Sequence, residues 1–395
     1  MRNGDDHIMP TYNRAELRFV RGAGAWLETA VGEKYLDFGS GVAVNTLGHA
    51  HPKLNQALQV QSEKLWHVSN LYQIPEQEKL ANSLCAASFA DYVFFTNSGA
   101  EAAEGMIKAM RKYHASNGAP ERVTLIGFDG AFHGRTLAAL AAAGNSAYLD
   151  GFGPVPQGFV HCSDLTKEAV EKLIDETTAG ILIEPVQGEG GVRDIGTTFL
   201  RALRSLCDKH GILLGFDEVQ CGIGRTGKLF AHEWAEVTPD VMAIAKGIGG
   251  GFPLGAVMST KAVGSAMQPG THGSTYGGNP LACAVGEAVL QEVESDGFLE
   301  QVQDCAVYFR QHLAHLLDEN SDIFEDLRGR GLMIGMKCRI ANSDIVAALR
   351  DENLLTVGAG ENVLRILPPL NVTKAEIDLA VKALESACAK LRARV

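Results

Sequence analysis

The stretch Val241-Met242-Ala243-Ile244-Ala245-Lys246 is followed at once by the glycine-rich run 247–251. Its apolar residues predict a short buried strand, with the lysine at the carboxyl end of that strand. Burial disfavours the charged form of an amine, so a lysine held there has a lowered pKa and becomes nucleophilic. Taken alone, Lys246 would more simply be read as a surface lysine that follows a strand.

Acidic residues follow two other strands of the same kind. Leu213-Leu214-Gly215-Phe216 runs into Asp217, and the apolar run 180–183 is followed by Glu184. Ligands of parallel α/β sheets bind beyond the carboxyl ends of the strands, so we expect these side chains to face one crevice together with Lys246. An amine that forms an imine and an acid that holds a protonated pyridine nitrogen are what pyridoxal phosphate (PLP) requires.

The length, composition and net charge of the chain limit its domain number, compartment and class of partner. A chain of 395 residues predicts two domains, and 46% hydrophobic with 21% charged residues is ordinary for a soluble protein. No apolar run approaches the roughly 20 residues that span a bilayer. The eight cysteines are scattered and suggest the cytoplasm. The net charge of −12 argues against nucleic acid or a membrane surface as partner, so anionic substrates must be held by particular arginines.

The order of the elements predicts an α/β fold. From about residue 90, short apolar runs alternate with helical patterns, which indicates a mostly parallel sheet sandwiched by helices. These runs cover residues 92–95, 123–128, 180–183, 212–216 and 241–245. An antiparallel element is expected at residues 25–38, and long amphipathic helices at 281–293 and 298–317. Short β segments at 331–338 and 363–367 and a last helix opened by the capping box Thr373–Glu376 complete the pattern.

This pattern predicts the division into domains. We expect a large domain at 46–280 and a smaller α+β domain at 281–395. The N-terminal segment 1–45 is expected to belong with the small domain.

Loops between these elements supply candidate binding residues. Ser98-Gly99-Ala100 precedes a helix, where free backbone N–H groups can hold a phosphate, although Ser98 with Glu101 also reads as an ordinary capping box. In the loop 132–136, Phe132 can stack on a heteroaromatic ring and Arg135 can bind a carboxylate. The simpler reading of that loop is a half-buried Phe and an exposed Arg.

Two further charged residues are candidates for a pair. Glu189 lies in a loop after the strand 180–183, and Arg365 lies inside an apolar strand, where an arginine is rarely without a partner. The run Gly222 to Lys228 matches the first seven positions of a P-loop, but Leu229 replaces the Ser or Thr that binds magnesium. A nucleotide hydrolase is therefore only a remote alternative, and no residue spacing indicates a metal site.

Six motifs occur together in one order. They are NSGAEAAE (97–104), FHGRT (132–136), EPVQGEGG (184–191), DEVQCGIGRTG (217–227), AKGIGGGFP (245–253) and STYGGNP (274–280). On these motifs the chain resembles the class III PLP-dependent aminotransferases of fold type I, from about Tyr12 to the C-terminus. The stretches 41–52 and 69–81 are most similar to members that act on N-acetylornithine.

The resemblance implies roles for the cofactor residues. Lys246 would form the imine with PLP and move the proton, and Asp217 would pair with the pyridine nitrogen. Phe132 and Val219 would cover the two ring faces, and Gln220 would bond the 3′-oxygen. The phosphate would be held by Ser98, Gly99 and Ala100, together with Thr275 from the neighbouring subunit of a homodimer.

The resemblance also implies the substrates. Arg135 would bind a substrate carboxylate, and Arg365 would bind the α-carboxylate of glutamate or 2-oxoglutarate. With an ω-amino substrate, Glu189 would instead pair with Arg365 and neutralise it. The expected reaction transfers the δ-amine of N-acetylornithine to 2-oxoglutarate without a metal. Ornithine, succinylornithine, N-succinyl-diaminopimelate and 4-aminobutyrate remain alternative amino donors, and an aminomutase or a PLP-binding scaffold without turnover remain alternative functions.

Overall fold

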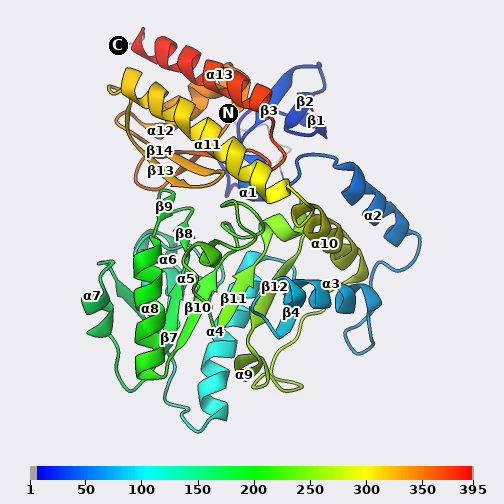
Figure 1. The fold of residues 1–395 in the computed structure, drawn as a ribbon, viewed down its shortest axis with the longest axis vertical. Helices are drawn as coiled ribbons and strands as arrows, with labels where there is room; N and C mark the ends of the chain where they lie inside the picture. Colours follow the sequence, from blue (N-terminus) through cyan, green and yellow to red (C-terminus); the bar gives the residue numbers. More distant parts are fainter. Residues whose placement is uncertain (1–6, 394–395) are drawn as a thin grey trace.

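The computed structural model describes residues 7–393, and Figure 1 shows a large α/β part below a smaller α+β part. Residues 1–6 of the predicted N-terminal segment lie outside this range. Within the described range, no helix combines the length and the apolar character needed to cross a membrane.

A seven-stranded sheet forms the centre of the large part, with the strand order β4-β12-β11-β10-β7-β5-β6. All neighbours pair in parallel except β12, which is antiparallel to both β11 and β4. The strands are β4 (Tyr92–Thr96), β5 (Thr124–Phe128), β6 (Phe159–Cys162), β7 (Thr178–Ile183), β10 (Leu213–Asp217), β11 (Val241–Ile244) and β12 (Gly255–Ser259).

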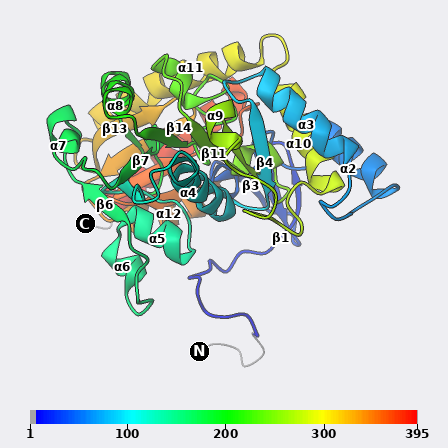
Figure 2. The ribbon, with the colours of Figure 1, turned by 90° about the horizontal axis from the view of Figure 1, so that it is seen from below.

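Alternate residues of this sheet enter two different cores, as the period of a strand requires when both faces are covered. On one face, Leu213, Val241 and Ala243 pack with α4 (Gly99–Ser116). On the other face, residues such as Phe216 and Ile244 share a core with α3 (Pro75–Ala86), α8 (Thr197–His210) and α10 (Pro280–Val293). Figure 2 shows α4 and α8 on opposite sides of the sheet.

Shorter elements complete the large part. They are α2 (Pro52–Ser62), α5 (Leu137–Ala143), α6 (Ser146–Leu149), α7 (Lys167–Glu171), α9 (Lys261–Gly264), the hairpin of β8 (Val186–Gln187) with β9 (Arg193–Asp194), and the 3₁₀ turns η1 (Ala231–Trp234) and η2 (Lys246–Gly249).

The upper part in Figure 1 comprises the two four-stranded sheets and the helices α11 (Phe298–Glu319), α12 (Asn342–Asp351) and α13 (Lys374–Arg392). One sheet joins β1 (Phe19–Ala23), β2 (Trp26–Thr29) and β3 (Lys34–Asp37) to β15 (Leu354–Leu355), so the N-terminal hairpin pairs with a strand more than 300 residues away along the chain. The other sheet has the order β13-β14-β17-β16. Its strands are β13 (Phe324–Arg330), β14 (Met333–Cys338), β16 (Val357–Ala359) and β17 (Val363–Ile366).

The buried residues of α10 and α11 belong to different cores. Those of α10, such as Val289 and Leu290, pack in the core of the large sheet, whereas those of α11, such as Phe309 and Leu313, pack with α13 and the small sheets. We therefore propose a large domain that runs through α10 and a small domain that begins at α11 and includes β1–β3. The left-handed turn α1 (Ser40–Ala43), which contributes Ala43 to a third cluster with Met333 and Val363, connects the two.

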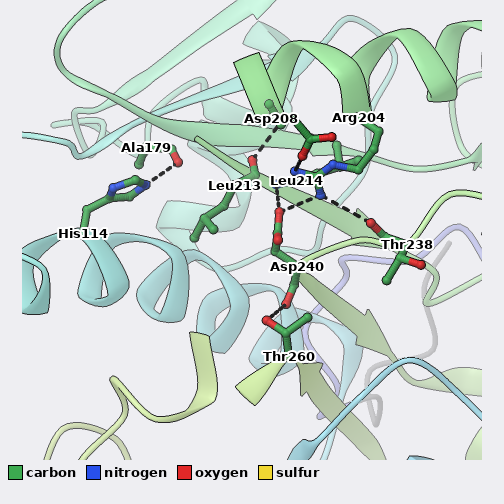
Figure 3. A network of polar contacts seen from close by, with 10 residues as sticks. His114, Ala179, Arg204, Asp208, Leu213, Leu214, Thr238, Asp240 and Thr260 are labelled. Atoms are coloured by element: carbon green, nitrogen blue, oxygen red, sulfur yellow. Dashed lines mark hydrogen bonds and ion pairs between the residues drawn. The ribbon is translucent and has the colours of Figure 1, made fainter. Parts of the chain in front are cut away.

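The amino ends of β10 and β11 are held by the carboxylate of Asp240 (Figure 3). Its Oδ2 accepts hydrogen bonds from the Leu214 N–H at 2.7 Å and from Nη1 of Arg204 at 2.8 Å, and its main chain bonds Leu214 and Thr260. Asp217 and Lys246 lie at the other ends of these two strands. The network therefore fixes the register of the strands that present them.

The observed elements agree with most of the expected ones. The α/β fold with its mostly parallel sheet is confirmed, and each of the five expected runs overlaps a strand of that sheet, with at most one residue outside it. Sequence analysis did not anticipate β6, β12 or β13, and it did not show that β12 runs antiparallel. The capping box at Thr373 is present, because Thr373 Oγ1 accepts from the Glu376 N–H and the Glu376 carboxylate accepts from the Thr373 N–H.

Candidate active site

Lys246 lies at the carboxyl end of β11, as the first residue of the 3₁₀ turn η2. Its φ of +45° places a non-glycine residue in the left-handed region, a strain of order 1–3 kcal/mol that surrounding structure must hold. Burial, and to a lesser extent the nearby positive charge of Arg365, lowers the pKa of Lys246 to about 8, against the raising effect of the carboxylates of Glu189, Asp217 and Glu184. A large fraction of this amine is therefore neutral near pH 8.

Asp217 lies at the carboxyl end of the neighbouring strand β10 and is buried. Its Oδ1 accepts a hydrogen bond from the Val219 N–H at 2.9 Å, and its Oδ2 is bonded by Nδ1 of His133 at 2.8 Å. Because a carboxylate only accepts hydrogen bonds, Nδ1 of His133 is the donor. The second ring nitrogen of His133, Nε2, is buried without a partner among the described residues.

His133 is a site residue that sequence analysis missed. Burial alone would lower the pKa of His133, but the hydrogen bond and the charge of Asp217 more than offset burial and raise it. The hydrogen bonds from His133 Nδ1 and from the Val219 N–H fix the orientation of the Asp217 carboxylate. The signal was present in the sequence, since His133 lies between Phe132 and Arg135 in the FHGRT motif, but a histidine in a loop has many ordinary explanations.

Glu184, which follows β7, connects two loops of the site. Its Oε2 accepts the Phe132 N–H at 3.0 Å, and its Oε1 lies 3.5 Å from the Gly188 N–H. Burial raises the pKa of Glu184, although the positive charge of His133 opposes this. The carboxyl group therefore ties the loop that carries Phe132 to the loop that carries Glu189.

Ser98, Gly99 and Ala100 lie at the N-terminus of α4, as expected. The Ser98 Oγ accepts a hydrogen bond from the Glu101 N–H at 3.2 Å, so Ser98 caps the N-terminus of α4. This cap leaves other donors of the turn free, because the N–H groups of Gly99 and Ala100 have no hydrogen-bond partner among the described residues. These two donors at a helix N-terminus can hold a phosphate.

Two glycines show how closely the loops approach one another. A Cβ on Gly99 would lie 2.7 Å from a methyl group of Val219 and 3.6 Å from Cβ of Ala245, the residue before Lys246. A Cβ on Gly134 would lie 2.6 Å from Cβ of Ala100. The loop of Phe132, the helix N-terminus and Val219 therefore meet beside Lys246.

Arg365 projects from β17 of the small domain and is 2% exposed. Its Nη1 donates to Oε1 of Glu189 at 2.7 Å and to Oε1 of Gln220 at 3.0 Å. Arginine has no acceptor, so the carbonyl oxygen of Gln220 must face Arg365 and its amide NH₂ is directed elsewhere, available to donate. The expected pair of Glu189 with Arg365 is thus present in the structure.

Arg135 and Thr275 make no hydrogen bond or ion pair, within the described residues, with the other predicted site residues. Arg135 is exposed and makes no ion pair within the described residues; its guanidinium instead lies 3.8 Å from the ring centroid of Tyr148 and 5.6 Å from that of Phe132. Thr275 is exposed, and no hydrogen bond within residues 7–393 joins it to Ser98, Gly99 or Ala100.

The P-loop-like run does not form a phosphate site. Residues 222–227 are buried, and the short 3₁₀ turn η1 follows them in place of a helix. Arg225 donates from Nη1 to the carbonyl oxygens of Leu332 and Pro368, so this loop binds the large domain to the small one. Within the described residues, no cluster of three or more His, Cys, Asp or Glu could hold a metal ion.

Comparisons with known proteins agree with this geometry. The family model for Aminotransferase class-III matches residues 9–388. The chain is 57% identical to acetylornithine aminotransferase 1 of Bradyrhizobium diazoefficiens over 98% of this chain and 95% of that protein. The chain belongs to the class III aminotransferases.

Solved structures of this family superpose closely. An N-acetylornithine aminotransferase from Stenotrophomonas maltophilia has a TM-score of 0.85 at 36% identity, with 97% of this chain and 98% of that chain covered. An ornithine aminotransferase from Toxoplasma gondii has a TM-score of 0.93 at 31% identity, covers 98% of this chain and 93% of that chain, and holds PLP at partial occupancy in its active site. The chain is therefore a PLP-dependent aminotransferase of fold type I.

The residues present fit the cofactor of a class III aminotransferase. The N–H groups of Gly99 and Ala100 offer unpartnered donors for the phosphate. Buried Asp217 offers a carboxylate that can pair with a protonated pyridine nitrogen, and Phe132 and Val219 offer apolar surfaces for a ring. Lys246 supplies the amine of lowered pKa.

The lowered pKa of Lys246 can be tested on this aminotransferase without turnover. After removal of PLP, reductive methylation of Lys246 should rise with pH and reach half of its maximal rate at about pH 8, because only the neutral amine reacts. Peptide mass spectrometry follows the labelling, with the exposed Lys167 as internal reference. A pH curve for Lys246 that coincides with that of Lys167 would contradict the assignment.

Proposed function

We propose that this aminotransferase transfers the δ-amine of N-acetylornithine to 2-oxoglutarate, giving N-acetylglutamate 5-semialdehyde and glutamate, a step of arginine biosynthesis. The support comes from the relatives named acetylornithine aminotransferase, at 55–58% identity over at least 96% of this chain. The observation on this chain that carries the proposal is the Arg365–Glu189 pair beside Lys246, because it can present either a neutral or a positive surface.

The proposed roles follow from the geometry. PLP, when bound, supplies an electron sink that makes the carbon bearing the amine acidic. Asp217, oriented by its hydrogen bond with His133, would pair with the protonated pyridine nitrogen, and the N–H groups of Gly99 and Ala100 would hold the phosphate with Ser98. Gln220 would donate its NH₂ to the 3′-oxygen. Lys246 Nζ would take the proton from the substrate carbon and return it, which its pKa of about 8 permits.

The visible spectrum of the purified protein tests the substrate directly. Adding N-acetylornithine should bleach the absorbance band of the lysine-bound cofactor, and adding 2-oxoglutarate should restore it. Ornithine, succinylornithine, N-succinyl-diaminopimelate and 4-aminobutyrate are the comparison donors. A band that N-acetylornithine leaves unchanged and that another donor bleaches would move the function to that donor, and the absence of any band with excess PLP would refute Lys246 as the attachment point.

Substrate exchange would use Arg365 as a switch. Glu189 is part-exposed, whereas Arg365 is almost fully buried, with side-chain exposures of 30% and 3%. The carboxylate of Glu189 can therefore swing away while the guanidinium stays, held by Gln220 and by the Gly358 carbonyl. Arg365 would then bind the α-carboxylate of glutamate or 2-oxoglutarate, whereas N-acetylornithine, which presents its δ-amine, would bind with the pair closed.

The switch predicts opposite effects of two substitutions. Arg365→Ala should slow the 2-oxoglutarate half-reaction at least about 30-fold more than the N-acetylornithine half, since a lost buried charge pair costs roughly 2 kcal/mol or more. Glu189→Gln should impair the N-acetylornithine half more, because Arg365 would be left with an uncompensated charge. Single-turnover kinetics of each half-reaction measures both effects. Equal damage to the two halves in both variants would rule out the switch.

We further propose a homodimer in which Thr275 completes the phosphate site of the partner subunit. Thr275 lines a cavity of about 830 Å³ together with His67, Asn70 and Leu71. Leu71 is 87% exposed, and Trp66, Tyr72 and Tyr276 are also exposed. Large apolar side chains gathered on one surface support burial against another chain.

Thr275→Ala should weaken PLP retention roughly tenfold or more, the loss expected for one hydrogen bond to a charged group. Dialysis followed by absorbance measures retention, and sedimentation equilibrium measures the mass. Thr271→Ala is the matched control, because the Thr271 hydroxyl already donates to the Gln268 carbonyl. A monomer that keeps PLP with wild-type affinity would contradict the shared site.

A further inference from the structure

Arg135 is held by aromatic rings and by no carboxylate. Its Cζ lies 3.8 Å from the ring centroid of Tyr148 and 5.6 Å from that of Phe132, and no ion pair of Arg135 occurs within residues 7–393. Arg365, the other arginine of the site, is instead held by Glu189 and Gln220. The two arginines are therefore positioned by different physical means.

The contact with Tyr148 leaves the donors of Arg135 free. A guanidinium is planar, with its N–H donors in the plane and two faces that attract aromatic rings. Cζ of Arg135 lies 3.8 Å above the centroid of the Tyr148 ring, and no hydrogen bond of Arg135 is present within residues 7–393. A ring on the face removes rotational freedom of the side chain without using a donor, so the edge remains available for a bidentate carboxylate.

The local fold fixes the position of Tyr148. α5 ends at Gly144, whose φ is +68° and where a Cβ would lie 2.5 Å from Nε2 of His161 on the neighbouring strand β6. The Asn145 side chain then accepts the Ala147 N–H at 3.0 Å and opens α6, the turn that carries Tyr148. The same His161 nitrogen bonds the carbonyl oxygens at the end of α5, so the turn is anchored to the sheet.

The edge-to-face contact between Phe132 and Tyr148 joins this turn to the cofactor loop. Their ring centroids are 6.3 Å apart at an interplanar angle of 88°. The Phe132 main chain is in turn held by Glu184. The guanidinium of Arg135 thus lies near two rings whose positions are set by separate parts of the large sheet.

We propose that Tyr148 is a positioning residue that orients the guanidinium of Arg135 for a substrate carboxylate and so contributes to the selection of dicarboxylates and carboxylate-bearing amines. The inference rests on the proposed function only in taking Arg135 as a carboxylate-binding residue. The ring, and not the hydroxyl, carries the effect, because the interaction is with the aromatic face.

A double-mutant cycle separates this role from a general structural one. The holoenzymes to compare are wild type, Tyr148→Leu, Arg135→Ala and the double variant, with Tyr148→Phe as the conservative variant and Phe152→Leu as a matched aromatic control in the same loop. Isothermal titration calorimetry with glutarate, an unreactive dicarboxylate, measures binding without turnover. Half-reaction kinetics with N-acetylornithine and 2-oxoglutarate measures KM and kcat.

Tyr148→Leu should raise the Kd of glutarate and the KM of the carboxylate substrates about 3- to 5-fold, the upper part of the range expected for a cation–π contact at an exposed site, with kcat within about twofold of wild type. Tyr148→Phe and Phe152→Leu should stay within about twofold of wild type. In the Arg135→Ala background, Tyr148→Leu should add little, because a residue that acts through Arg135 has nothing left to position.

Two outcomes would overturn the inference. An effect of Tyr148→Leu that is fully additive with Arg135→Ala would show that Tyr148 acts independently of Arg135, and a Tyr148→Phe variant as weak as Tyr148→Leu would show that the hydroxyl is the important group. If the wild type does not react with N-acetylornithine but the glutarate cycle shows the expected coupling, the proposed substrate is wrong and the role of Tyr148 stands.

Discussion

The chemistry of this protein depends on keeping one amine out of water. Lys246 has its lowered pKa because it is buried among charges that come from both domains: Asp217 from the large sheet, Glu189 from a loop beside it, and Arg365 from the small domain. Burial and the two carboxylates act in opposite directions on the pKa, and burial dominates. Because Arg365 belongs to the small domain, the packing of that domain against the large one contributes to the lowered pKa.

Contacts far from the amine secure that packing. Arg225 donates to carbonyl groups of the small domain, and Thr46 donates from Oγ1 to the Gly247 carbonyl while its own carbonyl accepts the Leu370 N–H. Arg225 joins the loop after β10 to the small domain, and Thr46 joins the turn after β11 to Leu370 near β17. The run that resembles a P-loop in sequence is thus one of the parts that close the site over Lys246.

The sequence predicted where Asp217 and Lys246 lie because the ends of apolar strands are readable in it. Asp217 and Lys246 follow apolar runs, so their placement needed only the rule that parallel strands present their carboxyl ends together. The structure brings them together with Phe132, Val219, Gln220, Glu189, Arg365 and the Ser98 turn. Side-chain partners were harder: the bond of His133 to Asp217 spans 84 residues and depends on a loop conformation that no local pattern encodes.

Some features of the fold have no local signal in the sequence. β12 is a short run with small residues, Gly255-Ala256-Val257-Met258-Ser259, whose strand character comes from pairing with β11 and β4 and not from local propensity. The apolar pattern of α10 shows a buried helix, but periodicity does not tell which core buries it. Tyr148 was missed because a tyrosine in a short turn has no signal until its ring is seen on Arg135.

The two arginines of the site suggest how one pocket serves two unlike substrates. An arginine that is already paired with a carboxylate can bind a second one only after the first leaves, so Arg365 responds to the state of Glu189. An arginine stacked on a ring keeps its donors free in every state, so Arg135 can bind the carboxylate that both substrates share. Under the proposed function, Arg365 would bind a carboxylate only after Glu189 has moved away, whereas Arg135 would bind one in both half-reactions. The two proposed roles differ because the fold places a carboxylate beside the guanidinium of Arg365 and an aromatic ring beside that of Arg135.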